Sequence, residues 1–121
     1  MAKIAVVEDN DAMREQLCGF IAQYARESGR QLDVTAFADG AEIVDPYRPG
    51  FDIIFLDIEM PTLGGMPTAE RIRQVDPDVV LVFVTNMAQY AIRGYEVDAL
   101  DFVLKPVSYY QFSTKLERAL Q

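Results

Sequence analysis

The sequence predicts a doubly wound α/β domain, because short apolar runs alternate with segments of helical spacing along all 121 residues. The apolar runs are rich in β-branched and aromatic residues, and no repeat, linker or low-complexity segment interrupts the alternation. Such a βα repeat gives a parallel sheet with helices on both faces. Five strands of this kind commonly take the order 2-1-3-4-5, with a switch point between strands one and three. We therefore expect a single domain over residues 1–121.

The five expected strands are the apolar runs bounded by turn or helix signals. They cover residues 4–7, 32–37, 51–57, 79–84 and 100–104. The third run, 51–57, is the most informative because it stops abruptly on the carboxylate of Asp57. In open α/β folds the carboxyl ends of strands form the edge where ligands bind.

The helices are predicted from apolar spacing and from start and stop signals. The first runs from Asp11 to about Ser28 and is ended by Gly29. A short helix is expected within residues 41–47, and another over 67–75, where Pro67 suits a first turn. Residues 86–93 are expected to form a short helix closed by a glycine, and Ser108 with Gln111 is typical of a capping box for the last helix.

Composition excludes several classes of site. The net charge is −8, from 19 acidic and 11 basic residues, which argues against this chain binding the phosphate backbone of a nucleic acid by itself. Histidine is absent, and the single Cys18 excludes an intramolecular disulfide and a cysteine-based zinc site. We expect neither a signal peptide nor a membrane-spanning run, and hence a cytoplasmic domain without membrane contact.

Five polar residues end strands of the predicted sheet at one edge. Glu8 and Asp9 follow the first strand, and Asp57 ends the third, which is its neighbour in the expected order. Thr85 and Lys105 close the fourth and fifth strands at the same edge. Asp57 alone would be an ordinary strand-end acid, and the acidic pair a helix cap. Because all five are expected at the same edge, they predict a functional site there.

Crowded carboxylates repel one another, and one takes up a proton unless a cation relieves them. Carboxylate and carbonyl oxygens suit a hard ion, so Mg²⁺ is the expected cofactor. Asp57 could then act as a nucleophile on a phosphoryl group and form an aspartyl phosphate. Lys105 would supply a positive charge and the Thr85 hydroxyl a hydrogen bond to phosphoryl oxygens. An ionised carboxylate needs no general base, which fits the absence of histidine.

These spaced motifs resemble the receiver domain of bacterial two-component response regulators. The residues that carry the resemblance are Glu8-Asp9, Asp57 with Met60-Pro61 and Gly65, Thr85, and Lys105-Pro106. The resemblance covers the whole chain, and segments 55–61 and 95–106 are similar to the branch of receivers joined to LytTR-type (LytR/AlgR-like) DNA-binding domains. It implies a flavodoxin-like (CheY-like) (βα)5 fold.

The resemblance also implies roles for individual residues. Asp57 would be the phosphoacceptor, Asp9 and Asp57 direct Mg²⁺ ligands, and Glu8 a ligand through water. The backbone carbonyl of Glu59 would complete the protein ligands. At the phosphoryl group, Thr85 and Lys105 would make contacts.

Phe102 would occupy the aromatic switch position, and the bond from Lys105 to Pro106 is expected to be cis, as is frequent in this family. Three residues depart from the family pattern. Gly64 replaces a polar residue and predicts a more flexible loop, Asn86 is bulkier than usual, and Phe102 lacks the hydroxyl of a frequent tyrosine.

The expected function is therefore a signalling switch that catalyses only its own phosphorylation and dephosphorylation. A sensor histidine kinase would be the phosphoryl donor, and phosphorylation would favour a homodimer that controls a DNA-binding output domain absent from this chain. The main alternative is a receiver-shaped interaction module that is not phosphorylated. A haloacid dehalogenase-type phosphatase is disfavoured because its nucleophile lies on the first strand, and a flavodoxin-like cofactor binder because acids follow that strand here.

Overall fold

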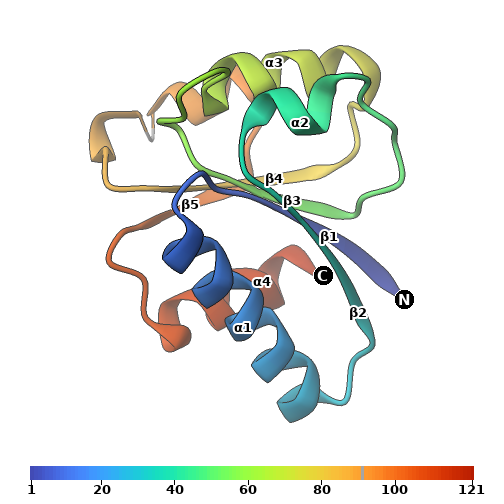
Figure 1. Cartoon of the computed structure of the whole chain (residues 1–121). Helices are drawn as coiled ribbons and strands as arrows, with labels where there is room; N and C mark the ends of the chain where they lie inside the picture. The colour runs from blue at the N-terminus through green and yellow to red at the C-terminus, as the bar shows by residue number, and fades with distance from the viewer. Residues whose placement is uncertain (91) are drawn as a thin grey trace.

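A computed structural model of the chain contains a parallel five-stranded sheet in the order β2-β1-β3-β4-β5 (Figure 1). The structure describes residues 1–90 and 92–121. The strands are β1 (Ala2–Val7), β2 (Leu32–Phe37), β3 (Ile53–Leu56), β4 (Val80–Thr85) and β5 (Asp101–Leu104). The fold class and the strand order predicted from the sequence are confirmed.

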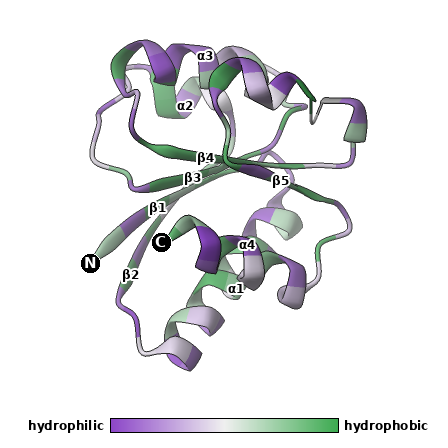
Figure 2. Cartoon of the chain, turned by 180° about the vertical axis from the view of Figure 1, so that it is seen from behind, coloured by the Kyte–Doolittle hydropathy of each residue, from purple (hydrophilic) through white to green (hydrophobic). Residues whose placement is uncertain are grey.

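Helices cover both faces of the sheet. The α-helices are α1 (Asp11–Ser28), α2 (Gly40–Val44), α3 (Gly65–Val75) and α4 (Tyr109–Ala119). Helices α1 and α4 lie on one face, and α2 and α3 lie on the other (Figure 1). Because each crossover packs a helix on one face, the sheet is buried on both sides and its central strands are continuously apolar. Figure 2 shows this as hydrophobic colour along β3 and β4.

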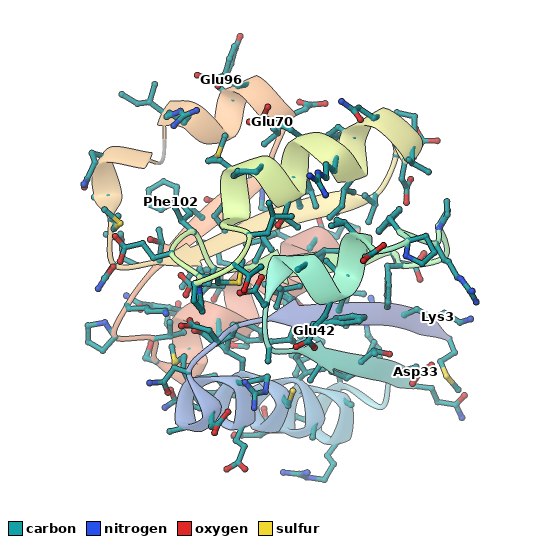
Figure 3. All side chains as sticks on the ribbon, turned by 45° about the horizontal axis from the view of Figure 1, so that its top comes forward. Lys3, Asp33, Glu42, Glu70, Glu96 and Phe102 are labelled. Carbon is teal, nitrogen blue, oxygen red and sulfur yellow. The ribbon has the colours of Figure 1, made fainter. Side chains whose placement is uncertain are left out.

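The two faces carry separate cores. Beneath α1 and α4, Phe55 and Phe112 lie with ring centroids 4.7 Å apart, in a cluster that also contains Leu17 and Ile21. Beneath α2 and α3, the core includes Ile72 of α3 and Phe83 of β4. Charged side chains extend outward instead, as Figure 3 shows for Glu70 and Glu96. These cores fix the strands whose ends carry the polar residues.

Local signals place both ends of α1 and the start of α4 where the sequence predicts them. The Asn10 side chain caps α1 by accepting a hydrogen bond of 2.9 Å from the Met13 amide, and Gly29 ends α1 with a φ of 72°. The Ser108 hydroxyl accepts from the Gln111 amide at 3.1 Å to begin α4. Because Asn10 serves as the cap, Glu8 and Asp9 are free for other contacts.

The connection between β4 and β5 differs from the prediction of one short helix over residues 86–93. The described part forms two 3₁₀ helices instead, η1 (Ala88–Tyr90) and η2 (Ile92–Val97), while Ala91 lies outside the described residues. A hydrogen bond of 2.9 Å from the Ala99 amide to the Gly94 carbonyl closes η2. Gly94 therefore lies inside η2 and does not end a helix. A Cβ atom at Gly94 would lie 3.5 Å from the Phe83 ring, so this part of η2 lies close to β4.

Among the described residues, no helix combines the length and the apolar character needed to cross a bilayer.

Candidate functional site

Three acidic side chains meet at the carboxyl ends of two neighbouring strands. Glu8 and Asp9 directly follow β1, and Asp57 directly follows β3, with Val7 opposite Leu56 in the parallel register. Each offers a carboxylate oxygen within 4.8 Å of the others. Glu8 and Asp57 are buried, while Asp9 is exposed. The structure therefore brings together the three carboxylates that the sequence predicted to converge.

The Asp57 carboxylate sits in an environment that disfavours its charge. Its side chain accepts a hydrogen bond of 2.8 Å from the Ile58 amide, and the residue is only 6% exposed. Burial, and then the negative charge of Glu8, raise the pKa of Asp57 to about 7, against the opposing effects of Lys105 and the Ile58 amide. A cation beside Asp57 would stabilise its ionised form and so lower its pKa.

Lys105 supplies the positive charge at the site. Its Nζ lies 2.7 Å from Glu8 Oε1 and 3.4 Å from Asp57 Oδ2. Burial lowers the pKa of the Lys105 ammonium, but hydrogen bonding to Glu8 and the charge of Asp57 outweigh that effect and raise it. The Lys105–Pro106 peptide bond is cis, as expected from the resemblance.

Thr85 lies at the same edge and is tied to Lys105 through the backbone. The Lys105 amide donates to the Thr85 carbonyl at 2.8 Å. The Thr85 side chain is buried, and its hydroxyl oxygen accepts a hydrogen bond of 3.0 Å from the Met87 amide. Its own hydroxyl hydrogen is still available as a donor. The neighbouring Asn86 is exposed, and it lines a hollow of about 430 Å³ together with Lys105.

The acidic cluster can hold a metal ion. Its side-chain donors are all oxygens, which suit a hard divalent cation. Glu8 Oε1 is buried, and the Lys105 ammonium lies 2.7 Å from it. Asp9 also lines a hollow of about 410 Å³ together with Glu59 and Met60 of the loop after β3. Clustered oxygen donors and nearby space are features that such an ion requires.

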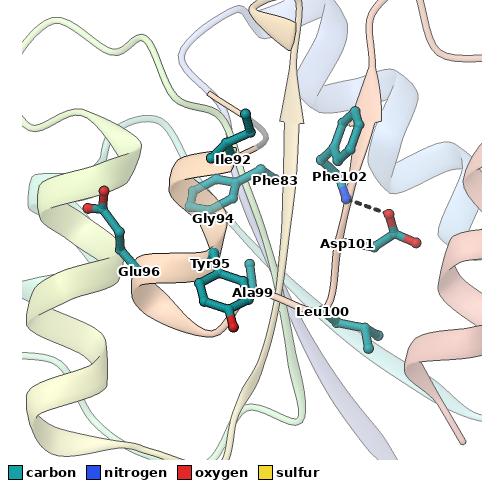
Figure 4. Close-up of a pocket in the computed structure, with 9 residues that line it drawn as sticks. All are labelled: Phe83, Ile92, Gly94, Tyr95, Glu96, Ala99, Leu100, Asp101 and Phe102. Atoms are coloured by element: carbon teal, nitrogen blue, oxygen red, sulfur yellow. Dashed lines mark hydrogen bonds between the residues drawn. The ribbon is translucent and has the colours of Figure 1, made fainter. Parts of the chain in front are cut away.

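Phe102 lies on β5, opposite Phe83 of β4. Both rings line a hollow of about 610 Å³ with Ile92 and Tyr95 of η2 (Figure 4). The hollow is mostly apolar, and Tyr95 is 91% exposed. It is thus separate from the acidic cluster. No charged group of the cluster lines it.

In metal-free protein, the Asp57 carboxyl is expected to titrate near neutral pH. Its folded pKa of about 7 exceeds the unfolded value of about 3.9. The folded state therefore holds the proton between these values, and the Asp57 contribution to the unfolding free energy falls as pH rises through that window. A carbon NMR titration in a chelating buffer measures the pKa directly.

Asp57→Asn is the control for this titration, because it removes the ionisable group with little change of shape. Its unfolding free energy should exceed that of wild type by more at about pH 8 than at about pH 5. An Asp57 pKa near the unfolded value would show that the site does not raise the pKa of this carboxyl. The difference in unfolding free energy between Asp57→Asn and wild type would then not depend on pH.

The sequence of the chain matches a known family over nearly its full length. Residues 4–117 match the response regulator receiver domain. The chain belongs to this family. It is thus a receiver domain of a response regulator, a signalling domain rather than an enzyme in the ordinary sense, and the resemblance noted in its motifs is confirmed.

Curated relatives agree with this assignment. The sensory transduction protein LytT of Oceanobacillus iheyensis is 31% identical over 95% of this chain and 46% of the relative. The transcriptional regulatory protein BtsR of Escherichia coli K12 is 31% identical over all of this chain and 49% of the relative. The chain thus spans about half the length of these relatives. The LytT matches agree with the predicted branch of the family.

Solved structures show the same fold. The non-phosphorylated HemR receiver domain from Leptospira biflexa superposes with a TM-score of 0.87 at 30% identity, covering 100% of this chain and 95% of that one. The response regulatory domain of mrkE from Klebsiella pneumoniae gives a TM-score of 0.85 at 28% identity, with 98% and 94% covered. The α/β receiver fold is therefore established for this chain.

Proposed function

We propose that Asp57 accepts a phosphoryl group with a Mg²⁺ ion bound beside it. Asp9 and Asp57 would be direct ligands, Glu8 a ligand through water, and the Glu59 backbone carbonyl the remaining protein ligand. The observation that carries the proposal is the convergence of three carboxylates within 4.8 Å, with the raised pKa of Asp57 among them. The bound ion would supply positive charge that neutralises the phosphoryl oxygens during transfer.

The residues of the chain supply the rest of the transfer. The Asp57 carboxylate attacks phosphorus, the bond to the donor atom breaks, and an acyl phosphate forms on Asp57. When the donor is a phosphohistidine of a sensor kinase, the imidazole leaves and takes up a proton. Lys105 balances the negative charge, and Thr85 donates its hydroxyl hydrogen to a phosphoryl oxygen. Attack of water on phosphorus would break the bond to the Asp57 oxygen, release inorganic phosphate and restore the carboxylate, which would be the receiver's own dephosphorylation.

Phosphorylation would then bias a two-state surface. Thr85 lies at the end of β4, before the connection that contains η1 and η2, and η2 borders the Phe102 hollow. Pulling Thr85 toward the phosphoryl group would shift this connection and let the Phe102 ring turn inward. The exposed Ile92, Tyr95 and Leu100 around the hollow would favour a homodimer. In a longer regulator such a dimer would control a DNA-binding output domain, in keeping with the name of BtsR as a transcriptional regulatory protein.

Acetyl phosphate tests the proposal without a kinase. Wild-type protein incubated with acetyl phosphate and Mg²⁺ is expected to gain the mass of one phosphoryl group, because acetate is a good leaving group. Asp57→Asn should gain none, and neither should wild type in a chelating buffer. Size-exclusion chromatography of the same samples reports the dimer.

An adduct on both proteins would contradict Asp57 as the acceptor. An adduct on neither would favour the alternative of a receiver-shaped interaction module that is not phosphorylated.

A further inference from the structure

The loop between β3 and α3 has no regular secondary structure, yet it is held at both of its ends. The Gly65 amide, at the start of α3, donates to the carbonyl of Ile58 at the start of the loop, at 2.8 Å, and so closes the base of the loop. Toward its far end, the amides of Thr62 and Leu63 donate to the carboxylate of Asp39, from the connection between β2 and α2. Glu59 lies between these two attachments.

Asp39 makes three backbone hydrogen bonds with one buried carboxylate. Oδ1 accepts from the Ala41 and Leu63 amides at 2.9 Å each, and Oδ2 accepts from the Thr62 amide at 3.0 Å. Burial raises the pKa of Asp39, but these hydrogen bonds outweigh it, so the net pKa is lowered and the carboxylate stays ionised. A helix cap for α2 needs only the bond to Ala41. The other two bonds act on the loop.

Gly40 lets the loop approach closely. A Cβ atom at this position would overlap the Thr68 hydroxyl oxygen and would lie 2.5 Å from the Leu63 carbonyl oxygen. Any side chain at residue 40 would therefore displace the loop or the first turn of α3. The loop is thus held by the carboxylate of one residue and by the missing side chain of the next.

We infer that Asp39 and Gly40 form a clamp that positions the metal-binding loop, and that Asp39 is a positioning residue for the Mg²⁺ site. The inference rests on the proposed function, since it assigns the clamp the task of holding the Glu59 carbonyl beside Asp9. Residues that orient metal ligands without touching the ion commonly change metal affinity by about 10–100-fold. Asp39 would do so although it lies 23 residues before Thr62 in the sequence.

Asp39→Ser separates the clamp from the helix cap. The serine hydroxyl can still accept from the Ala41 amide and cap α2, but it is too short to reach Thr62 and Leu63. In ¹H–¹⁵N NMR of the metal-free variant, these two amides should exchange faster with solvent, while amides of α2 keep their protection. A Mg²⁺ titration of the same sample should give an affinity at least about 10-fold weaker than wild type.

Two further variants sharpen the test. Gly40→Ala keeps the carboxylate of Asp39 but pushes on Leu63, so it should also weaken Mg²⁺ binding. Tyr47→Phe is the control, because it removes a hydrogen bond of 2.7 Å to Asp76 and should leave Mg²⁺ affinity unchanged. Neither Tyr47 nor Asp76 belongs to the proposed site.

The outcomes separate the two proposals. Asp39→Ser and wild type binding Mg²⁺ equally tightly would overturn the inference and leave the proposed function standing. Equal losses of Mg²⁺ affinity in Asp39→Ser and Tyr47→Phe would overturn it too, since general destabilisation would then explain the effect. A wild type that binds no Mg²⁺ would contradict the proposed function, and the inference with it.

Discussion

Lys105→Met is expected to lower the unfolding free energy of the metal-free protein by about 2–3 kcal/mol near neutral pH. The substitution removes the ammonium 2.7 Å from Glu8 and leaves that carboxylate, which is 1% exposed, without its cation. Breaking a buried ion pair costs more than breaking a surface pair, because the remaining charge stays desolvated. The side chain of Lys105 is 21% exposed, which moderates the loss. Urea unfolding measures it.

Lys115→Met is the matched control. The Lys115 ammonium pairs with Asp101 Oδ2 at 2.8 Å, but Arg118 also contacts that oxygen at 3.1 Å and would remain. We therefore expect a loss below about 1 kcal/mol. Adding Glu8→Gln to Lys105→Met should restore most of the lost stability, because the orphaned charge disappears. Equal losses for Lys105→Met and Lys115→Met would mean that the contacts at the acidic cluster contribute little.

Gly65→Ala is expected to disturb the site through the backbone. A Cβ atom at Gly65 would overlap the Asp57 carbonyl oxygen and would lie 2.8 Å from Ile58 Cα. Since these are backbone atoms, the start of α3 must move away from the end of β3. Forced contacts of this kind typically cost about 1–3 kcal/mol. The variant should also bind Mg²⁺ more weakly and gain the phosphoryl group from acetyl phosphate more slowly.

Gly19→Ala provides the comparison for this substitution. Gly19 lies inside α1, and a Cβ atom there would meet nothing within 4 Å. Alanine should stabilise that helix by about 0.5–1 kcal/mol and leave phosphorylation unchanged. Thermal unfolding and the acetyl phosphate reaction compare the two variants. If Gly65→Ala behaves like Gly19→Ala in both, the close approach at Gly65 does not constrain the site.

The strands and the strand order could be predicted because buried parallel strands have a simple signature. An apolar run such as 79–84 in a short chain indicates a buried strand, and five βα units commonly take a single strand order. That order was enough to place Glu8, Asp9 and Asp57 together, as the structure shows. Their chemical roles stay predictions, because proximity of carboxylates does not by itself select an ion or a phosphoryl donor.

The parts that the sequence did not predict depend on contacts distant along the chain. Residues 86–93 were predicted as a short helix from a cap at Asn86 and a stop at Gly94, but Gly94 lies inside η2, where a Cβ atom would come 3.5 Å from the Phe83 ring. Asp39 was missed because an acid before a helix is typical of a simple cap. Its bonds to Thr62 and Leu63 become visible only when β2 and β3 are placed in the sheet.

Locating the phosphoryl group tests the central claim most directly. Borohydride reduces an aspartyl phosphate to homoserine, so wild-type protein treated with acetyl phosphate and Mg²⁺ can be reduced, digested and sequenced by mass spectrometry. We predict homoserine at position 57 and at no other aspartate. Homoserine at Asp9, or a stable phosphoryl group on Thr85 with residue 57 unmodified, would contradict the assignment of Asp57 as the phosphoacceptor.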